Sequence, residues 1–176
     1  MRPAIRCGPA PRCSGTGGCV GHATVLGAAG AAYRPGLLAM RLGPVLADAV
    51  RALPAPPDVL LVDATGRDHP RRAGLATHLG AALGIPTVGV THRPLLASGD
   101  WPADRRGARG PLILDGSPVG YWLRTRTGRR PLAVHAAWRT DPDTAAEIVL
   151  AVSSHRTPAP LREARRLARH ARAHAG

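Results

Sequence analysis

The sequence predicts a single α/β domain, and three stretches of the chain lead to that prediction. Residues 59–62 read V-L-L-V, a run of branched apolar residues typical of a strand buried on both faces of a sheet. A helical pattern and a second apolar run at 87–91 follow, which together predict a parallel βαβ unit with a right-handed crossover. Apolar runs at 112–114, 119–125 and 132–136 are separated by Asp-Gly and Thr-Gly, which predicts an antiparallel meander.

The domain is expected to occupy residues 33–176. With 176 residues and 44% hydrophobic content, the chain is long enough for one globular unit with a substantial core. Residues 1–32 are rich in Gly, Pro and small side chains, and only residues 23–26 suggest a short strand. We therefore treat residues 1–32 as a poorly defined N-terminal segment.

Two helices are predicted around the first strand. Apolar residues recur at helical spacing over 42–53, with Pro44 near the start, and a cluster of prolines ends this helix. The second helix follows the turn at Pro70, which fits the first turn of a helix, and ends at Gly84, a residue typical of helix C-termini.

The second half of the chain predicts a loop and two further helices. Residues 97–110 are polar and charged, which indicates an exposed loop. Asp141 and Pro142 mark the start of a helix that reaches about Val152. Residues 161–174 alternate arginines with apolar residues at helical spacing, and we interpret them as a basic amphipathic helix with a solvated face.

The charge balance favours a polyanionic partner. All 24 cationic side chains are arginines, against 11 acids, so the formal net charge is +13. Such an excess is typical of proteins that bind nucleic acid. The alternative is a biased coding composition, since Phe and Lys are both absent.

The cysteine pattern and hydropathy predict a cytoplasmic, soluble protein, and we expect a monomer. Cys7, Cys13 and Cys19 are odd in number and give no complete disulfide framework. With His22 they supply four potential zinc ligands, but their five-residue gaps differ from the usual spacing of a zinc knuckle. No signal-peptide run and no membrane-spanning stretch is evident, so no membrane partner is expected.

Charged residues follow both predicted parallel strands. Asp63 comes directly after the first strand, and His92 and Arg93 follow the second. Because parallel strands end at the same edge of a sheet, these side chains are expected to meet there. Asp63 is then either the anchor of a site or a solvated strand end. The turn after it is unusually rich in charge: Arg67, Asp68, His69, Arg71 and Arg72 surround Pro70.

Four motifs in this order and spacing resemble the endonuclease V family. They are Y-R-P-G-L-L-A-M-R, V-D-A-T-G-R-D-H-P-R-R, G-I-P-T-V-G-V and the D-G-S-P-V-G-Y-W-L-R-T-R meander, and the resemblance spans Tyr33 to Arg169. It implies a ribonuclease H-like fold, a mixed sheet flanked by helices. It also implies cleavage of DNA or RNA near a deaminated adenine, a repair-type reaction that uses Mg²⁺ (or Mn²⁺) held by carboxylates.

The resemblance assigns roles to individual residues. Asp63 matches a catalytic, metal-binding aspartate, and Tyr33 with Pro35 and Gly36 matches a wedge that separates strands. Arg139 and Asp143 match conserved positions of the family after the meander, and Arg139 is assigned to substrate binding. The turn that approaches the lesion and the backbone corresponds to Gly66, His69, Pro70, Arg71 and Arg72, of which the two arginines are candidate phosphate contacts.

Several positions depart from the family pattern. Leu42 stands where the family has a metal-binding glutamate, His92 where it has a catalytic lysine, and Trp138 where it has a histidine. The first-strand aspartate has no counterpart, because no acid precedes Tyr33. The chain thus resembles a divergent, N-terminally incomplete member with first strands missing or degenerate, and Mg²⁺ is expected to bind weakly.

Some alternatives stay open at this stage. Asp68 or His69 can compensate for the lost carboxylates, or Asp68 is a solvated turn residue. His92 is either a cation near phosphate or a surface histidine. For the whole chain, three functions remain: a metal-dependent endonuclease, a nucleic-acid-binding protein without turnover, and an α/β domain acting on a small molecule.

Overall fold

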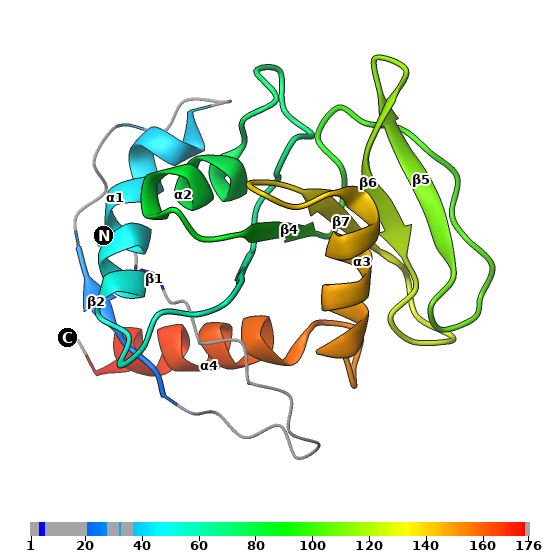
Figure 1. Cartoon of the computed structure of the whole chain (residues 1–176). Coiled ribbons are helices and arrows are strands. Elements are labelled where there is room, and N and C mark those ends of the chain that lie inside the picture. The colour runs from blue at the N-terminus through cyan, green and yellow to red at the C-terminus, as the bar shows by residue number, and fades with distance from the viewer. Residues whose placement is uncertain (1–3, 6–20, 28–31, 33–36, 175–176) are drawn as a thin grey trace.

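The computed structural model describes residues 4–5, 21–27, 32 and 37–174 (Figure 1). Its main sheet has five strands in the order β3-β4-β7-β6-β5. Their bounds are Leu60–Val62 (β3), Thr87–Thr91 (β4), Arg109–Leu114 (β5), Ser117–Leu123 (β6) and Leu132–Ala136 (β7). A separate antiparallel pair joins β1 (Ala4–Ile5) to β2 (Val25–Leu26), which confirms the short strand predicted near residue 25.

The βαβ unit forms as predicted. Strand β3 pairs in parallel with β4, with Leu60 opposite Thr87, and α2 (Leu75–Leu83) connects them. Gly84 ends α2 in the left-handed region at φ 70°, which a residue without Cβ adopts at little cost. The prediction that Pro70 opens this helix is wrong. The chain instead makes a turn at Pro70, and Arg72, at φ 53°, interrupts any helical path before Leu75.

The meander also forms as predicted, because its turns suit antiparallel strands. Strands β4, β7, β6 and β5 pair antiparallel in that order. Asp115 and Gly116 connect β5 to β6 with φ values of 48° and 72°, as a two-residue hairpin turn requires. The expected exposed loop over 97–110 is only partly correct, since Ser98 bridges Ile113 and Ala97 is buried.

Four helices in the described residues cover the two faces of this sheet, as Figure 1 shows. Alternate residues of β3 point to opposite faces. Leu60 and Val62 pack with α1 (Leu38–Arg51) and α2, whereas Leu61 packs with α3 (Pro142–Ala151) and the start of α4 (Ala159–Ala173). A mixed sheet covered on both faces is therefore the observed architecture.

The helix boundaries refine the predictions. Helix α1 starts at Leu38, so Pro44 lies inside it and not near its start. Proline has no N–H to offer the carbonyl of Met40, and this is tolerated because Met40 lies in an exposed first turn. The predicted cap of α3 is confirmed, since the Asp141 side chain accepts the N–H of Thr144 at 2.9 Å.

The described helices include none that is both long and apolar enough to cross a bilayer. The apolar face predicted for the last helix is confirmed in α4, where Leu161, Ala164 and Leu167 are buried. Cys7, Cys13 and Cys19 lie outside the described residues. The expectation that they do not form a zinc knuckle therefore stays a prediction.

Candidate nucleic-acid site at the Asp63 edge

Asp63 lies at the end of β3, in a hollow between α1 and α4. The hollow has a volume of about 440 Å³, and the side chain of Asp63 is 49% exposed. Its lining combines leucines of α1 with arginines of α4, among them Leu38, Leu42, Arg165, Arg169 and Arg172. Asp63 thus lies in a hollow lined by both apolar side chains and arginines.

Arg165 neutralises this carboxylate. Its Nε and Nη2 atoms both donate to Asp63 Oδ2, at 3.1 and 2.7 Å. Both side chains are more than a third exposed, so the pair is worth no more than about 1 kcal/mol. The predicted basic amphipathic helix forms, and α4 directs one of its arginines, Arg165, at the end of β3.

The donor set near Asp63 does not fit Mg²⁺. This ion takes oxygen ligands in octahedral geometry, commonly from more than one carboxylate. All eleven acids of the chain lie between Asp48 and Glu163, within the described residues, and Leu42 occupies the hollow where a second one is needed. Over residues 37–174 no group of three His, Cys, Asp or Glu side chains is arranged to hold a metal ion.

His92 follows β4 and lies at the same edge, as predicted. Its pKa is lowered by partial burial and by the charges of Arg156 and Arg165, and the Asp63 carboxylate opposes this only in part. Arg156 Nη1 lies 3.0 Å from His92 Nδ1. A neutral imidazole supplies no positive charge at pH 7, so at this edge Arg156 and Arg165 carry it.

The turn after Asp63 packs against the sheet. A Cβ on Gly66 would lie 2.2 Å from the carbonyl oxygen of Ala136, so this position admits only glycine. Asp68 is fully buried and is not the solvated turn residue considered above. Its carboxylate accepts three backbone N–H groups of the segment after β4, those of Leu95, Leu96 and Ala97, at 2.5, 2.8 and 2.8 Å.

The later residues of this turn, from His69 to Arg72, differ in burial and in the groups they contact. His69 is buried, and its Nδ1 accepts the N–H of Arg71 at 3.2 Å, whereas Pro70 and Arg71 are exposed. Arg72 reaches the hairpin at the far edge of the sheet, where Nη2 donates to Leu114 O at 3.1 Å and to Asp115 at 2.9 Å. The Arg72 guanidinium binds this hairpin. Its contact with a phosphate therefore stays a prediction.

Trp138 and Arg139 follow β7 as a packed pair. The Arg139 guanidinium lies 5.8 Å from the centroid of the Trp138 ring, and Arg139 adopts φ 52°. Trp138, at the position where the family resemblance predicts a histidine, thus places an aromatic surface under the Arg139 cation. Tyr33, Pro35 and Gly36 lie outside the described residues, so the wedge stays a prediction.

His135 is a site feature that the sequence did not single out. It is fully buried in β7, with Nε2 2.8 Å from Thr91 Oγ1 and Nδ1 3.7 Å from Asp68. Burial lowers its pKa to about 4, although Asp68 partly opposes this. The only sign of this residue in the sequence is a histidine inside the apolar run L-A-V-H-A. Hydrophobic periodicity does not tell whether such a histidine packs in the core or acts as a ligand.

Comparison with known proteins shows the family of this chain. The family model of endonuclease V matches residues 15–166. Endonuclease V of Streptomyces avermitilis is 41% identical over 153 residues, which cover 86% of this chain and 67% of that relative. The chain belongs to the endonuclease V family. It spans about two thirds of the length of this curated relative.

Solved structures confirm the ribonuclease H-like mixed fold. The crystal structure of the Streptomyces avermitilis endonuclease V superimposes with a TM-score of 0.88 at 35% identity, covering 99% of this chain and 82% of that one. The endonuclease V of Ciona intestinalis, solved with a 24mer DNA containing an inosine, shares the fold at a TM-score of 0.74 and 22% identity, covering 87% and 72%. The family is one of nucleic-acid endonucleases.

Proposed function

We propose that this chain binds nucleic acid at the Asp63 edge without cleaving it. The observation that carries the proposal is the Asp63–Arg165 ion pair in a hollow where Leu42 takes the position predicted for the family's metal-binding glutamate. An aspartate held by a guanidinium, with no second carboxylate beside it, lacks the charge and the oxygen ligands that a divalent cation needs. Arginine in this position favours the phosphates of a bound strand.

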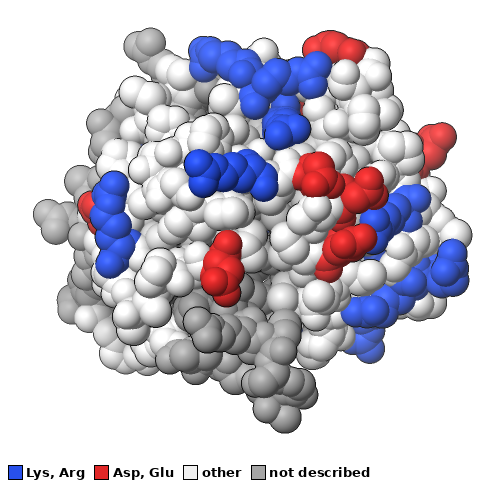
Figure 2. Space-filling view, in the orientation of Figure 1, with Lys and Arg blue, Asp and Glu red and all other residues white. Residues whose placement is uncertain are grey.

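Charge and family both support a nucleic-acid partner. The net charge of +13 favours a polyanion, and the related Ciona protein binds an inosine-containing DNA. Figure 2 shows a cluster of acidic side chains near α3, whose first turns carry Asp143 and Glu147, with basic side chains both beside it and elsewhere on this face. Arg109 forms ion pairs with both of these acids. A strand is therefore expected to avoid α3 and follow the arginines.

Metal-dependent cleavage beside a deaminated adenine is the second candidate. It is favoured by family membership and by the exposure of the Asp63–Arg165 pair, since an ion pair of about 1 kcal/mol can be displaced by a cation. Under this candidate Asp63 would be a ligand of Mg²⁺ or Mn²⁺, and the inosine-containing strand would be the substrate. A phosphate of that strand would then replace Asp63 as the ion-pair partner of Arg165.

One experiment separates the two candidates. Purified protein is incubated with inosine-containing and control oligonucleotides, DNA and RNA, across a Mg²⁺ and Mn²⁺ series, beside Asp63→Ala. The proposal predicts salt-sensitive binding, no nicking in either metal, and equal or tighter binding by Asp63→Ala, because the removed carboxylate repels phosphate.

Two results would contradict the proposal. Metal-dependent nicking of the inosine strand that disappears in Asp63→Ala would establish the second candidate. Failure to bind any oligonucleotide at low salt would exclude both.

A further inference from the structure

An arginine-rich groove continues from the Asp63 edge along the ends of the central strands. It has a volume of about 890 Å³ and is formed by the segments after β4 and before β7, together with Trp101 and Arg156. His92 belongs both to this groove and to the surroundings of Asp63. Its ionisable lining consists of four arginines, Arg93, Arg129, Arg130 and Arg156, together with His92, and it includes no acid.

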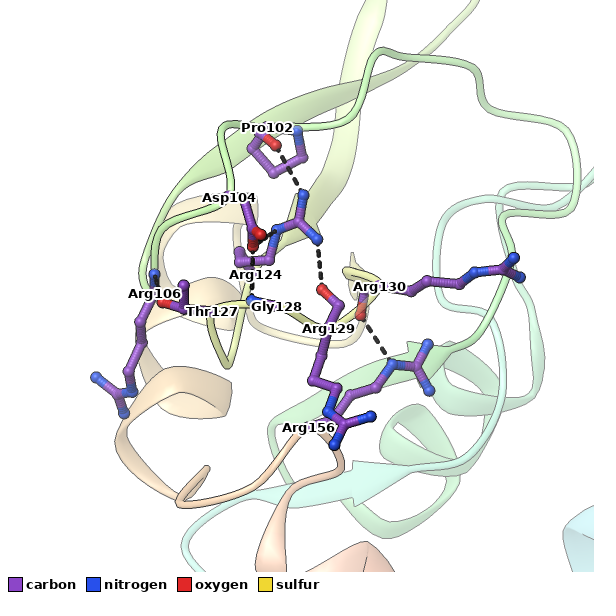
Figure 3. A network of polar contacts seen from close by, with 9 residues as sticks. All are labelled: Pro102, Asp104, Arg106, Arg124, Thr127, Gly128, Arg129, Arg130 and Arg156. Atoms are coloured by element: carbon purple, nitrogen blue, oxygen red, sulfur yellow. Dashed lines mark hydrogen bonds and ion pairs between the residues drawn. The ribbon is translucent and has the colours of Figure 1, made fainter.

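The walls of this groove are fixed by their own polar contacts. The buried Arg124 donates to the carbonyl of Arg129 and to that of Pro102, the latter at 3.1 Å (Figure 3). Asp104 accepts the N–H of Gly128 at 2.9 Å, and Arg156 Nε donates to the carbonyl of Arg130 at 2.8 Å. The 101–106 segment, the β6–β7 connection and the Arg156 side chain therefore hold the groove open without using the side chains of Arg93, Arg129 and Arg130.

The guanidinium groups of Arg93, Arg129 and Arg130 make no hydrogen bond or ion pair with any residue in the described ranges. In Figure 3 the side chain of Arg130 extends away from the network that holds its backbone. Burial, and then the positive charges of Arg130 and Arg165, lower the pKa of Arg156, so Arg130 and Arg156 repel one another. Repulsion of this kind is relieved by phosphate.

Trp101 adds an aromatic surface to these cations. It is 55% exposed and packs edge-on against Trp122, with ring centroids 6.1 Å apart and planes at 71°. Trp122 is buried and donates from Nε1 to the carbonyl of Gly99 at 3.0 Å, which fixes the support beneath Trp101. An exposed indole beside unpaired arginines is the combination that binds single strands, by stacking on a base and by charge on the phosphates.

We infer that this groove binds a single-stranded nucleic-acid segment, with a base stacked on Trp101 and phosphates on Arg129 and Arg130. The inference rests on the proposed nucleic-acid partner but not on the presence or absence of cleavage. A single strand is favoured over a duplex because the Trp101 ring can stack only on an unpaired base. The strand would run past His92 toward Asp63.

The test measures binding of a fluorescent oligothymidine of about 15 nucleotides, without inosine or metal, by anisotropy across a salt series. Trp101→Ala is expected to weaken binding roughly 5- to 150-fold, the range seen for loss of one stacked base. Arg129→Gln with Arg130→Gln is expected to weaken it and to flatten the salt slope by about 0.7 per lost phosphate contact. The matched control, Arg51→Gln with Arg166→Gln, removes the same charge from ion pairs outside the groove and should weaken binding least.

Binding by both groove variants equal to that of the control would overturn the inference, and so would equal losses by Trp101→Ala on the oligothymidine and on a blunt duplex. Circular dichroism checks that the variants are folded, which is expected because all substituted side chains are exposed. Inosine-strand cleavage by the wild-type protein would refute the proposed function but leave this inference standing if the groove variants still lose single-strand binding.

Discussion

Asp63 and Asp68 are five residues apart, and their surroundings assign them different roles. Asp63 is half-exposed and faces Arg165, whereas Asp68 is fully buried and accepts three backbone N–H groups. A carboxylate bound in this way anchors a segment of chain and is not available to a metal. Asp68 is thus a structural residue that fixes the start of the groove wall.

Replacing Asp68 by Ala should therefore destabilise the protein strongly. The change leaves the N–H groups of Leu95, Leu96 and Ala97 without their acceptor, and the buried Ala97 N–H alone costs about 1–3 kcal/mol when it is unsatisfied. We expect a loss of about 3 kcal/mol or more in the free energy of unfolding, measured by urea denaturation. Asp68→Asn, which keeps one acceptor oxygen, should lose less, and equal stability of Asp68→Ala and wild type would contradict this role.

His135 predicts a specific pH dependence. Its pKa in the folded protein is about 4, below the unfolded value near 6.5, so the unfolded state binds more protons between these values. Stability is then fully present above pH 6.5 and is lost as pH falls toward 4, by about 2 kcal/mol between pH 7 and pH 5. His135→Asn removes this titration, so its urea midpoint should change less over that interval. An equal pH dependence of the two proteins would refute the assignment.

At the scale of elements, the site depends on α1 and α4 meeting β3. Helix α1 presents Leu42 to the hollow, and α4 presents Arg165. An alkyl group at Leu42, where the resemblance to the family predicts a carboxylate, and a cation beside Asp63 both disfavour a metal.

Reversing both changes should create a metal site. The double variant Leu42→Glu with Arg165→Gln places a second carboxylate on the lining of the hollow and releases Asp63 from its ion pair. We expect its affinity for Mn²⁺ to rise at least about tenfold over wild type, measured by calorimetry. Leu42→Gln with Arg165→Gln is the matched control, since it adds an amide in place of the acid, and similar affinities of the two variants would contradict the expectation.

For the whole molecule, local sequence patterns predicted the helices and strands well, but they predicted the contacts between these elements less well. The apolar run of β3, the Gly84 cap and the Asp141 cap each act within a few residues, so periodicity and capping rules found them. Pro70 misled the prediction because the conformation of Arg72, which prevents an earlier helix start, depends on contacts with a distant hairpin.

The candidate site was predicted in part for the same reason. The common edge of Asp63 and His92 follows from chain direction in a parallel βαβ unit. The partner of Asp63 is 102 residues away in the sequence, and nothing in the pattern of α4 distinguishes Arg165 from its neighbouring arginines. Trp101 and Arg129 likewise come together only through the β6–β7 connection.

The proposed function requires that an arginine, and not a metal ion, neutralises Asp63. Direct titration of the purified wild-type protein with Mn²⁺, followed by electron paramagnetic resonance of the unbound ion, tests it most directly. If Arg165 neutralises Asp63, we expect no saturable site below millimolar concentrations, in the wild type or in Asp63→Ala. One Mn²⁺ bound per chain in the micromolar range, and lost in Asp63→Ala, would contradict it.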